Sequence, residues 1–164
     1  MTAPDLGARP VHDDALAAFR RIHWSYADRD PAALGELRHR IADTGRRRQL
    51  IRYSDLVHGV TFRLPNVGSG DPFQIDIGDW RDIDRDLLGD FLGFLSFETY
   101  ERHGFMASAL VVSKADDNPS DGFWNLMKLL GLVKNPRSDK ATFFWLDQVQ
   151  RAHDWYAAHP EADV

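Results

Sequence analysis

Cysteine is missing from this chain of 164 residues. Its absence excludes disulfides, a thiolate nucleophile and cysteine-ligated zinc. A cysteine-free chain fits a reducing compartment, and we expect a cytoplasmic protein.

Long apolar runs are missing as well. No stretch approaches the length of a membrane span, and the first residues, MTAPDLGARPVHDDALAAF, lack the apolar core of a secretory signal. We therefore expect neither a membrane anchor nor a leader. The sequence also lacks HExxH, GxSxG and a glycine-rich phosphate loop, so it predicts no catalytic residues, no metal site and no cofactor.

Positive charge is scarce. The chain has 20 Lys and Arg residues and 25 Asp and Glu residues, which gives a net charge of −5. A negative surface disfavours non-specific contact with nucleic acid, because phosphate binding requires a positive field.

Hydrophobic residues are plentiful. They make up 43% of the chain and include five Trp and ten Phe, which is a globular composition. We expect one globular domain over 11–159, with a flexible arm at 1–10 and a flexible tail at 160–164.

Helical periodicity dominates the pattern. Asp30 and Pro31 are suited to the N-cap and first position of a helix, and Ser54 and Asp79 to two further N-caps. Gly104 is a typical C-terminal stop. The apolar spacing predicts helices over 12–27, 31–42, 55–59, 79–103, 123–130 and 140–158.

One continuous apolar run, 108–113, interrupts this pattern and predicts a strand buried on both faces. Because a lone strand cannot satisfy its own backbone groups, we expect partners in 50–53 and 61–64. Residues 61–78 are typical of a loose hairpin or exposed loop around a turn at 68–72. The predicted fold class is α+β: a mainly helical single domain with a small two- or three-stranded sheet, of which a winged helix is one form.

Four segments resemble a widespread family of bacterial proteins to which no function is assigned. They are IRYSDL (51–56), LLGDFLGFLS (87–96), MASALVVSK (106–114) and PSDGFWNLMKLLG (119–131). The resemblance covers about half of the chain and implies a bacterial protein, but it supplies no mechanism.

The order of motifs also resembles the winged-helix DNA-binding domain of alkylguanine-DNA alkyltransferases and alkyltransferase-like proteins. A basic residue precedes a Tyr-Ser-x-Leu helix, and a Gly-bearing helix, a Val-Val strand and a Gly-aromatic loop follow. The resemblance matches 54–59 to the first helix of a helix-turn-helix and 85–95 to the recognition helix. The family's Pro-Cys-His-Arg motif is Ala-Ser-Ala-Leu here, at 107–110, and the insert 61–78 departs from the pattern. Alkyl transfer is therefore excluded, and the resemblance implies DNA or nucleotide binding alone.

The basic segment 46–58 is the first candidate binding site. It lies where a helix-turn-helix would contact phosphates, although Arg47 and Arg48 could instead hold a carboxylate of a protein partner. The simpler alternative is a solvated turn whose arginines pair with acids elsewhere in the chain. The candidate residues are Arg46, Arg47, Arg48, Arg52, Tyr53, Ser54 and His58.

The last helix is the second candidate. If Phe144 and Tyr156 are core residues, Trp145 and Trp155 are partly exposed and mark a partner surface. The alternative is that the N-terminal helices bury both sides of this helix.

Two polar segments leave an enzymatic function as the alternative prediction. The Asp-rich stretch 71–90 could bind Mg²⁺ or Ca²⁺, but helix capping explains its carboxylates more simply. The loop 115–122 could flank a ligand at a strand end, but Asn-Pro and Asp-Gly are ordinary turn dipeptides, with Ser120 or Asp121 capping the next helix.

Together these patterns predict a non-enzymatic cytoplasmic binding or regulatory module. Its partner is a protein or nucleic acid, contacted through 46–58 and the aromatic helices, and a homo-oligomer is left open. The alternative is an enzyme with a metal- or nucleotide-dependent site near the start of the Asp-rich helix or in the loop 115–122.

Overall fold

The computed structural model describes residues 8–162. The predicted arm up to residue 7 and the last two residues of the predicted tail lie outside the described residues. Within this range six α-helices and two short 3₁₀ helices accompany a two-stranded sheet, so the predicted α+β, mainly helical class is confirmed. In chain order the elements are α1 (Ala8–Arg20), η1 (Ala27–Arg29), α2 (Pro31–Arg46), β1 (Ile51–Arg52), α3 (Tyr53–Val57), α4 (Asp82–His103), η2 (Ala107–Leu110), β2 (Val111–Val112), α5 (Asp121–Leu129) and α6 (Asp139–Ala158).

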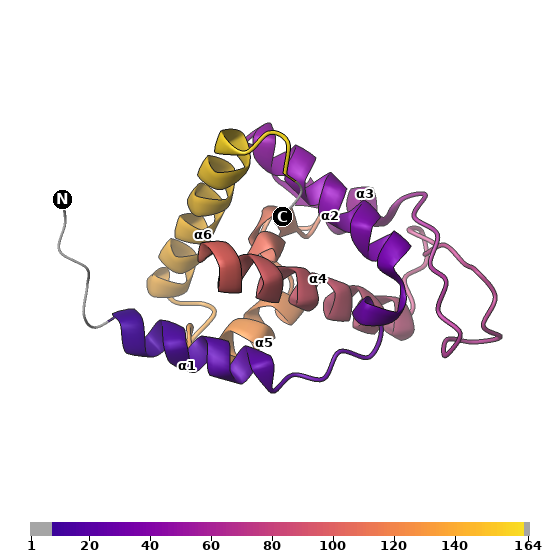
Figure 1. Cartoon of the computed structure of the whole chain (residues 1–164), viewed down its shortest axis with the longest axis horizontal. Coiled ribbons are helices and arrows are strands. Elements are labelled where there is room, and N and C mark those ends of the chain that lie inside the picture. The colour runs from indigo at the N-terminus through magenta and orange to yellow at the C-terminus, as the bar shows by residue number, and fades with distance from the viewer. Residues whose placement is uncertain (1–7, 163–164) are drawn as a thin grey trace.

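Helix α4 runs through the middle of the molecule (Figure 1). Helices α2 and α6 pack on each other beside it, and α1 and α5 cover its other side. One apolar core lies among α2, α3, α4 and the loop after α3, and Phe91 of α4 is fully buried in it. A second core joins α1, α5 and α6 to the end of α4, where Tyr100 contributes. Because α4 supplies both cores, it fixes the position of the other helices.

Helix α2 begins as its sequence predicts. The Asp30 carboxylate accepts the backbone N–H of Ala33 at 3.1 Å, and Pro31 occupies the first turn. The predicted stop at 43–45 is wrong, because the helix continues to Arg46. Gly45 is buried against the Tyr156 ring of α6, so this glycine permits close packing and does not end the helix.

The sheet consists of β1 and β2 paired in parallel, with Ile51 opposite Val111 and Arg52 opposite Val112. The predicted pairing of the apolar run with 50–53 is therefore confirmed. The predicted pairing with 61–64 is wrong, because Phe62 forms an antiparallel bridge with Phe73. That bridge closes the loose hairpin expected over 61–78.

The strand is shorter than predicted, because residues 107–110 form the 3₁₀ helix η2. Side chains of α4 and α6 take the place of further strand partners. The Thr99 hydroxyl accepts the N–H of Ala107 at 3.0 Å, and the Gln148 side chain accepts that of Met106 at 2.8 Å. The Ser96 hydroxyl accepts the N–H of Ser108 at 3.0 Å. These buried polar groups satisfy a backbone that has no sheet neighbour.

Several predicted helix boundaries shift. Helix α1 spans 8–20 and not 12–27, because Pro10 is tolerated in a first turn and the chain after Arg20 leaves the helix. Helix α3 begins at Tyr53, so Arg52, not Ser54, occupies the N-cap position. Helix α4 begins at Asp82 with Arg81 at its N-cap, where Asp79 was predicted. Gly104 ends α4 in the left-handed conformation as expected, at φ 77°.

Candidate functional site

The arginines of the basic segment lie at the surface between α2 and β1, and each has a partner within the chain. Arg47 pairs with Asp43 at 3.1 Å and Arg48 with Asp154 of α6 at 2.9 Å. Arg46 donates to the carbonyl of Ala162 at 2.8 Å. The Arg48 hydrogen bond is the main cause that lowers the pKa of the Asp154 carboxyl. Arg47 and Arg48 thus show the pairing with acids that the sequence offered as the simpler alternative, whereas Arg46 donates to a carbonyl.

Two candidate segments that the sequence treated separately meet beside the sheet. Arg52 of β1 lies 3.5 Å from Asp117 in the loop after β2. The Tyr53 hydroxyl donates to the Ser120 hydroxyl at 2.9 Å and accepts the Ser120 N–H at 3.1 Å. Burial raises the pKa of Tyr53, and the two hydrogen bonds to Ser120 oppose that rise. This arrangement keeps the phenol neutral and anchors the start of α5 to the first residue of α3.

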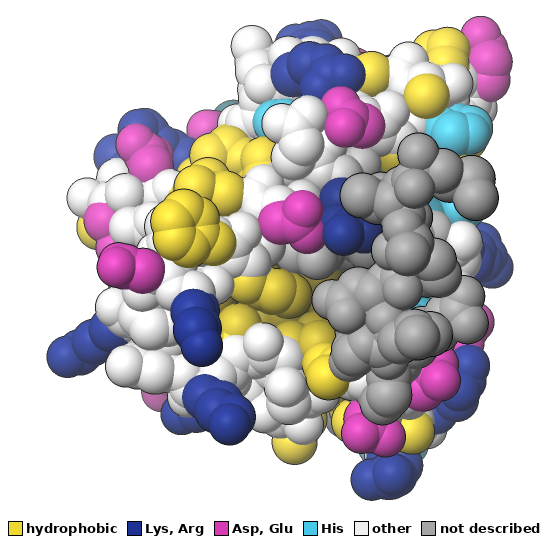
Figure 2. Space-filling view, turned by 90° about the vertical axis from the view of Figure 1, so that its left-hand side faces the viewer, with side chains coloured by type: hydrophobic (Ala, Val, Ile, Leu, Met, Phe, Trp, Pro, Cys, Tyr) yellow, Lys and Arg dark blue, Asp and Glu magenta, His cyan; other side chains and the backbone are white. Residues whose placement is uncertain are grey.

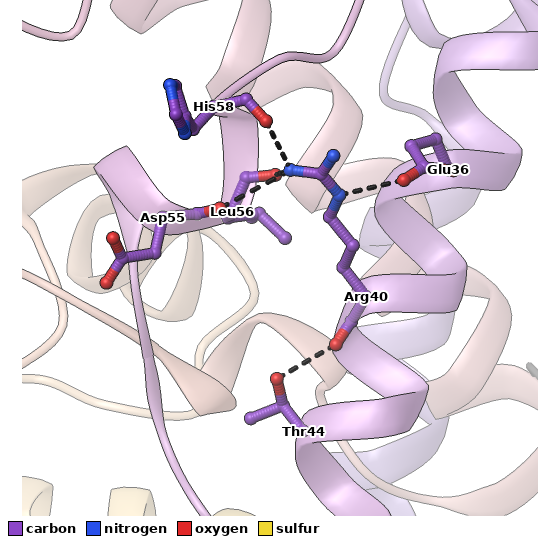
Figure 3. A network of polar contacts seen from close by, with 6 residues as sticks. All are labelled: Glu36, Arg40, Thr44, Asp55, Leu56 and His58. Carbon is purple, nitrogen blue, oxygen red and sulfur yellow. Dashed lines mark hydrogen bonds and ion pairs between the residues drawn. The ribbon is translucent and has the colours of Figure 1, made fainter.

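The end of α3 is held by Arg40 of α2 (Figure 3). One terminal nitrogen of its guanidinium donates to the carbonyls of Leu56 at 3.0 Å and His58 at 2.7 Å, while Nε donates to Glu36 at 2.8 Å. Arg40 therefore satisfies carbonyls that the short helix leaves open. The predicted site residue His58 has an exposed side chain, and Ser54 is half-buried with its carbonyl bonded to the His58 N–H.

The predicted exposure of Trp145 is wrong. Its side chain is buried, with 7% of its surface exposed, and its indole N–H donates to the Ala109 carbonyl at 2.9 Å. It supports η2 and is absent from the surface.

Trp155 is half-buried between two imidazoles. The rings of His103 and His159 stack on its faces, with centroids at 4.2 Å and 4.3 Å. Partial burial lowers the pKa of His103, and the nearby charges of His159 and Arg102 lower it further. Trp155 is thus the central ring of this stack, and His103 is neutral at pH 7.

The large exposed apolar residues of α6 are Phe143 and Leu146, one turn apart; the apolar spacing predicted Leu146 as a core residue, and that prediction is wrong. Phe143 is 70% exposed and Leu146 49%. We call these two residues the α6 apolar face. Figure 2 looks onto the side of the molecule where α6 lies, and it shows groups of hydrophobic side chains, one of them in the middle of the face, with side chains of both charges around them. The sequence could predict the exposure of Phe143 and Leu146 only if it showed that Trp145 and Gln148 lie on the buried side of α6.

The Asp-rich segment serves turns and helix ends. Asp84 is buried at the start of α4, where its carboxylate accepts the Arg81 N–H at 2.9 Å. Asp76 accepts the Gly78 N–H at 2.9 Å. Asp90 accepts three backbone N–H groups of the segment 25–27. In residues 8–162 no three His, Asp or Glu side chains gather as a metal site would require.

The segment matched to a recognition helix, 85–95, lies inside α4, where Leu87, Leu88, Phe91 and Leu95 face the core. The insert 61–78 forms a separate loop closed by the Phe62–Phe73 bridge. No helix in the part of the chain described is both long and apolar enough to cross a membrane.

No protein-family model, curated protein or solved structure matches the chain. The two resemblances noted in the sequence therefore remain predictions.

Proposed function

We propose that the protein is a non-enzymatic binding module that acts through a protein contact. The occupant of its α6 apolar face is a second copy of the same chain. The observation that carries this proposal is the exposure of Phe143, 70% of whose surface is open to water although it is a large apolar side chain. Exposed aromatic residues on a helix face are typical of protein contacts.

The charges around this face are self-complementary. Lys140 lies one turn before Phe143, is exposed, and forms no ion pair with any of residues 8–162. Asp147 lies one turn after Phe143 and pairs with Arg151 at 2.7 Å. In an antiparallel two-fold arrangement, Phe143 of each helix meets Leu146 of the other. Lys140 then approaches the Asp147 end of the second copy.

The contact is narrow, so the association is weak. Two apolar residues cannot bury the ~800 Å² per partner of a stable interface, and we expect a dissociation constant on the order of 100 μM. Two chains of net charge −5 repel each other, and this repulsion outweighs the attraction of exposed Lys140 and Asp147 pairs, which contribute only about 0–1 kcal/mol each, so added salt strengthens the association. Binding of nucleic acid would show the opposite dependence on salt.

Phe143→Asp is expected to weaken self-association about tenfold or more, because each copy would then bury a charge in the apolar contact. Leu129→Asp is the matched control, since Leu129 is 65% exposed but lies on α5. Sedimentation velocity over a range of protein and salt concentrations measures the effect. A wild-type chain that stays monomeric throughout, or a Phe143→Asp variant that associates like wild type, contradicts the proposal.

Nucleic acid is the second candidate partner, and the exposure of the paired arginines favours it. Arg47 and Arg48 have 65% and 51% of their side-chain surface exposed. Surface ion pairs contribute only about 0–1 kcal/mol, so phosphate groups could compete with Asp43 and Asp154. The arginines would then contact a nucleic-acid backbone beside β1.

Fluorescence anisotropy with labelled duplex and single-stranded DNA and RNA tests this candidate. We expect no binding at physiological salt, because the net charge of the chain is negative and its arginines are already paired. Binding that weakens with salt would support the candidate if it is lost in Arg46→Ala/Arg47→Ala/Arg48→Ala. It must also persist when three exposed arginines elsewhere are replaced, namely Arg21, Arg29 and Arg137.

A further inference from the structure

A hollow of about 270 Å³ lies between the first turns of α2 and the segment 59–63. Its lining residues are distant from α6 in the sequence, and none of them belongs to the α6 apolar face. The residues that line it and matter for its chemistry are Ala32, Glu36, Arg40, Thr61 and Arg63.

Arg40 is fixed in this hollow by contacts within the protein. Its Nε and one terminal nitrogen are bound to Glu36 and to the carbonyls at the end of α3 (Figure 3). Its other terminal nitrogen, Nη2, makes no hydrogen bond to any of residues 8–162. The guanidinium is therefore held rigidly with donors to spare, and a ligand would not have to order it.

Arg63 brings a second guanidinium to the same hollow. Its backbone N–H donates to the buried carboxylate of Asp30, with N and O 2.6 Å apart, which ties this segment to the start of α2. Its side chain is exposed and forms no ion pair within the described part of the chain. Arg47, Arg48 and Arg52 each have a carboxylate partner, so Arg63 differs from the arginines of the basic segment.

The lining has two guanidinium groups and one carboxylate, which leaves it positive in an acidic chain. Arg63 can bind an oxyanion through a forked pair of N–H donors, Arg40 can add its Nη2 donor, and the start of α2 adds a favourable dipole. We propose that this hollow binds a small organic oxyanion, namely a phosphate monoester or a short-chain carboxylate. Its volume lies at the lower edge of the ~300–1,000 Å³ of small-molecule pockets, which favours a ligand smaller than a nucleotide.

Glu36 gives the site a second kind of contact. Its side chain is 47% exposed, and its carboxylate uses one oxygen on Arg40. The remaining oxygen can accept a hydrogen bond from a ligand hydroxyl or amine. The Thr61 hydroxyl, which has no hydrogen-bond partner among residues 8–162, adds a neutral donor. A hydroxylated or amine-bearing oxyanion therefore fits better than a bare ion.

The experiment is an NMR titration of the ¹⁵N-labelled full chain. Sodium phosphate and sodium acetate are the two probes, each compared with sodium chloride at matched ionic strength. We expect saturable shifts of the amides of Gly59, Thr61 and Arg63 with a probe and not with chloride. Saturation by phosphate alone identifies phosphate esters, and saturation by acetate alone identifies carboxylates. Saturation by both supports the shared oxyanion chemistry.

Arg63→Ala is expected to weaken the apparent affinity about tenfold or more, because a charge-assisted donor pair is lost. Arg29→Ala is the matched control, since Arg29 is exposed and lies on η1, outside the hollow. The melting temperature of each variant in chloride verifies its folding. Two results would overturn the proposal: no saturable shift with either probe, or an Arg63→Ala variant that binds the saturating probe as tightly as wild type.

Discussion

Replacing Gly45 by Ala is expected to lower the free energy of unfolding by about 3 kcal/mol. Gly45 is buried where α2 packs on α6, and an added Cβ would overlap the Tyr156 ring, with Cγ at 2.8 Å. Tyr156 is itself 1% exposed, so the ring has no free space into which to move. The two helices must separate or the ring must leave its position, and either change costs packing energy.

The matched control lies in the same helix. An added Cβ at Gly35 would meet no atom within 4 Å outside the neighbouring backbone. Gly35→Ala is therefore expected to raise the free energy of unfolding by up to about 1 kcal/mol, through helix propensity alone. Urea denaturation followed by tryptophan fluorescence measures both variants. Equal stabilities for Gly45→Ala and Gly35→Ala would show that α2 and α6 are not in close contact at this point.

Asp90→Ala is expected to lower the free energy of unfolding by about 2–4 kcal/mol. Its carboxylate accepts the backbone N–H groups of Ser25, Tyr26 and Ala27 at 2.9, 2.9 and 2.8 Å. Two of these donors lie in the irregular segment between α1 and η1, the third belongs to the first residue of η1, and no helical carbonyl can replace the lost acceptor. The change would leave partly buried N–H groups without partners.

Asp86→Ala is the control for charge and helix propensity. Asp86 is exposed on α4, one turn before Asp90, and its carboxylate makes no hydrogen bond to any of residues 8–162. We expect Asp86→Ala to change the free energy of unfolding by less than about 0.5 kcal/mol. Hydrogen exchange offers a local measurement, because the three amide protons should lose protection in Asp90→Ala alone. Unchanged protection of these amides in Asp90→Ala would contradict the assigned role.

Local rules predicted the parts of the fold that depend on neighbouring residues. Asp30 and Pro31 at the start of α2, and Gly104 at the end of α4, follow from capping and backbone preference. The pairing of 50–53 with the apolar run followed from the need of a buried strand for a partner.

Burial of polar side chains could not be predicted in the same way. Hydrophobic spacing placed Phe144 and Leu146 in the core of α6, but the buried row contains Trp145 and Gln148. Gln148 is buried because its carbonyl oxygen accepts the N–H of Met106, which lies in a distant segment. Which side of α6 is buried therefore depends on a contact with a distant segment, and the sequence of α6 alone does not predict it.

In the candidate site, too, features that depend on neighbouring residues were predicted and contacts between distant segments were not. The arginines of 46–48 and Arg52 were recognised as a group, and their carboxylate partners were foreseen only as a class. Arg40 and Arg63 became a pair only when the fold placed α2 beside the segment 59–63. Contacts between distant segments follow from tertiary packing, which periodicity and capping do not encode.

The parallel pairing of β1 with β2 has a consequence for the order of folding. These strands are separated along the chain by α3, the loop 61–78 and the whole of α4. Parallel strands require such a crossover, and closing the large loop costs entropy before any strand contact forms. Each strand has only two residues, so its pairing cannot offset that cost by itself. We expect α4 and α6 to assemble first and to hold 105–110 in place. The sheet would then be among the last elements to form, and the chain would fold more slowly than its helix content implies.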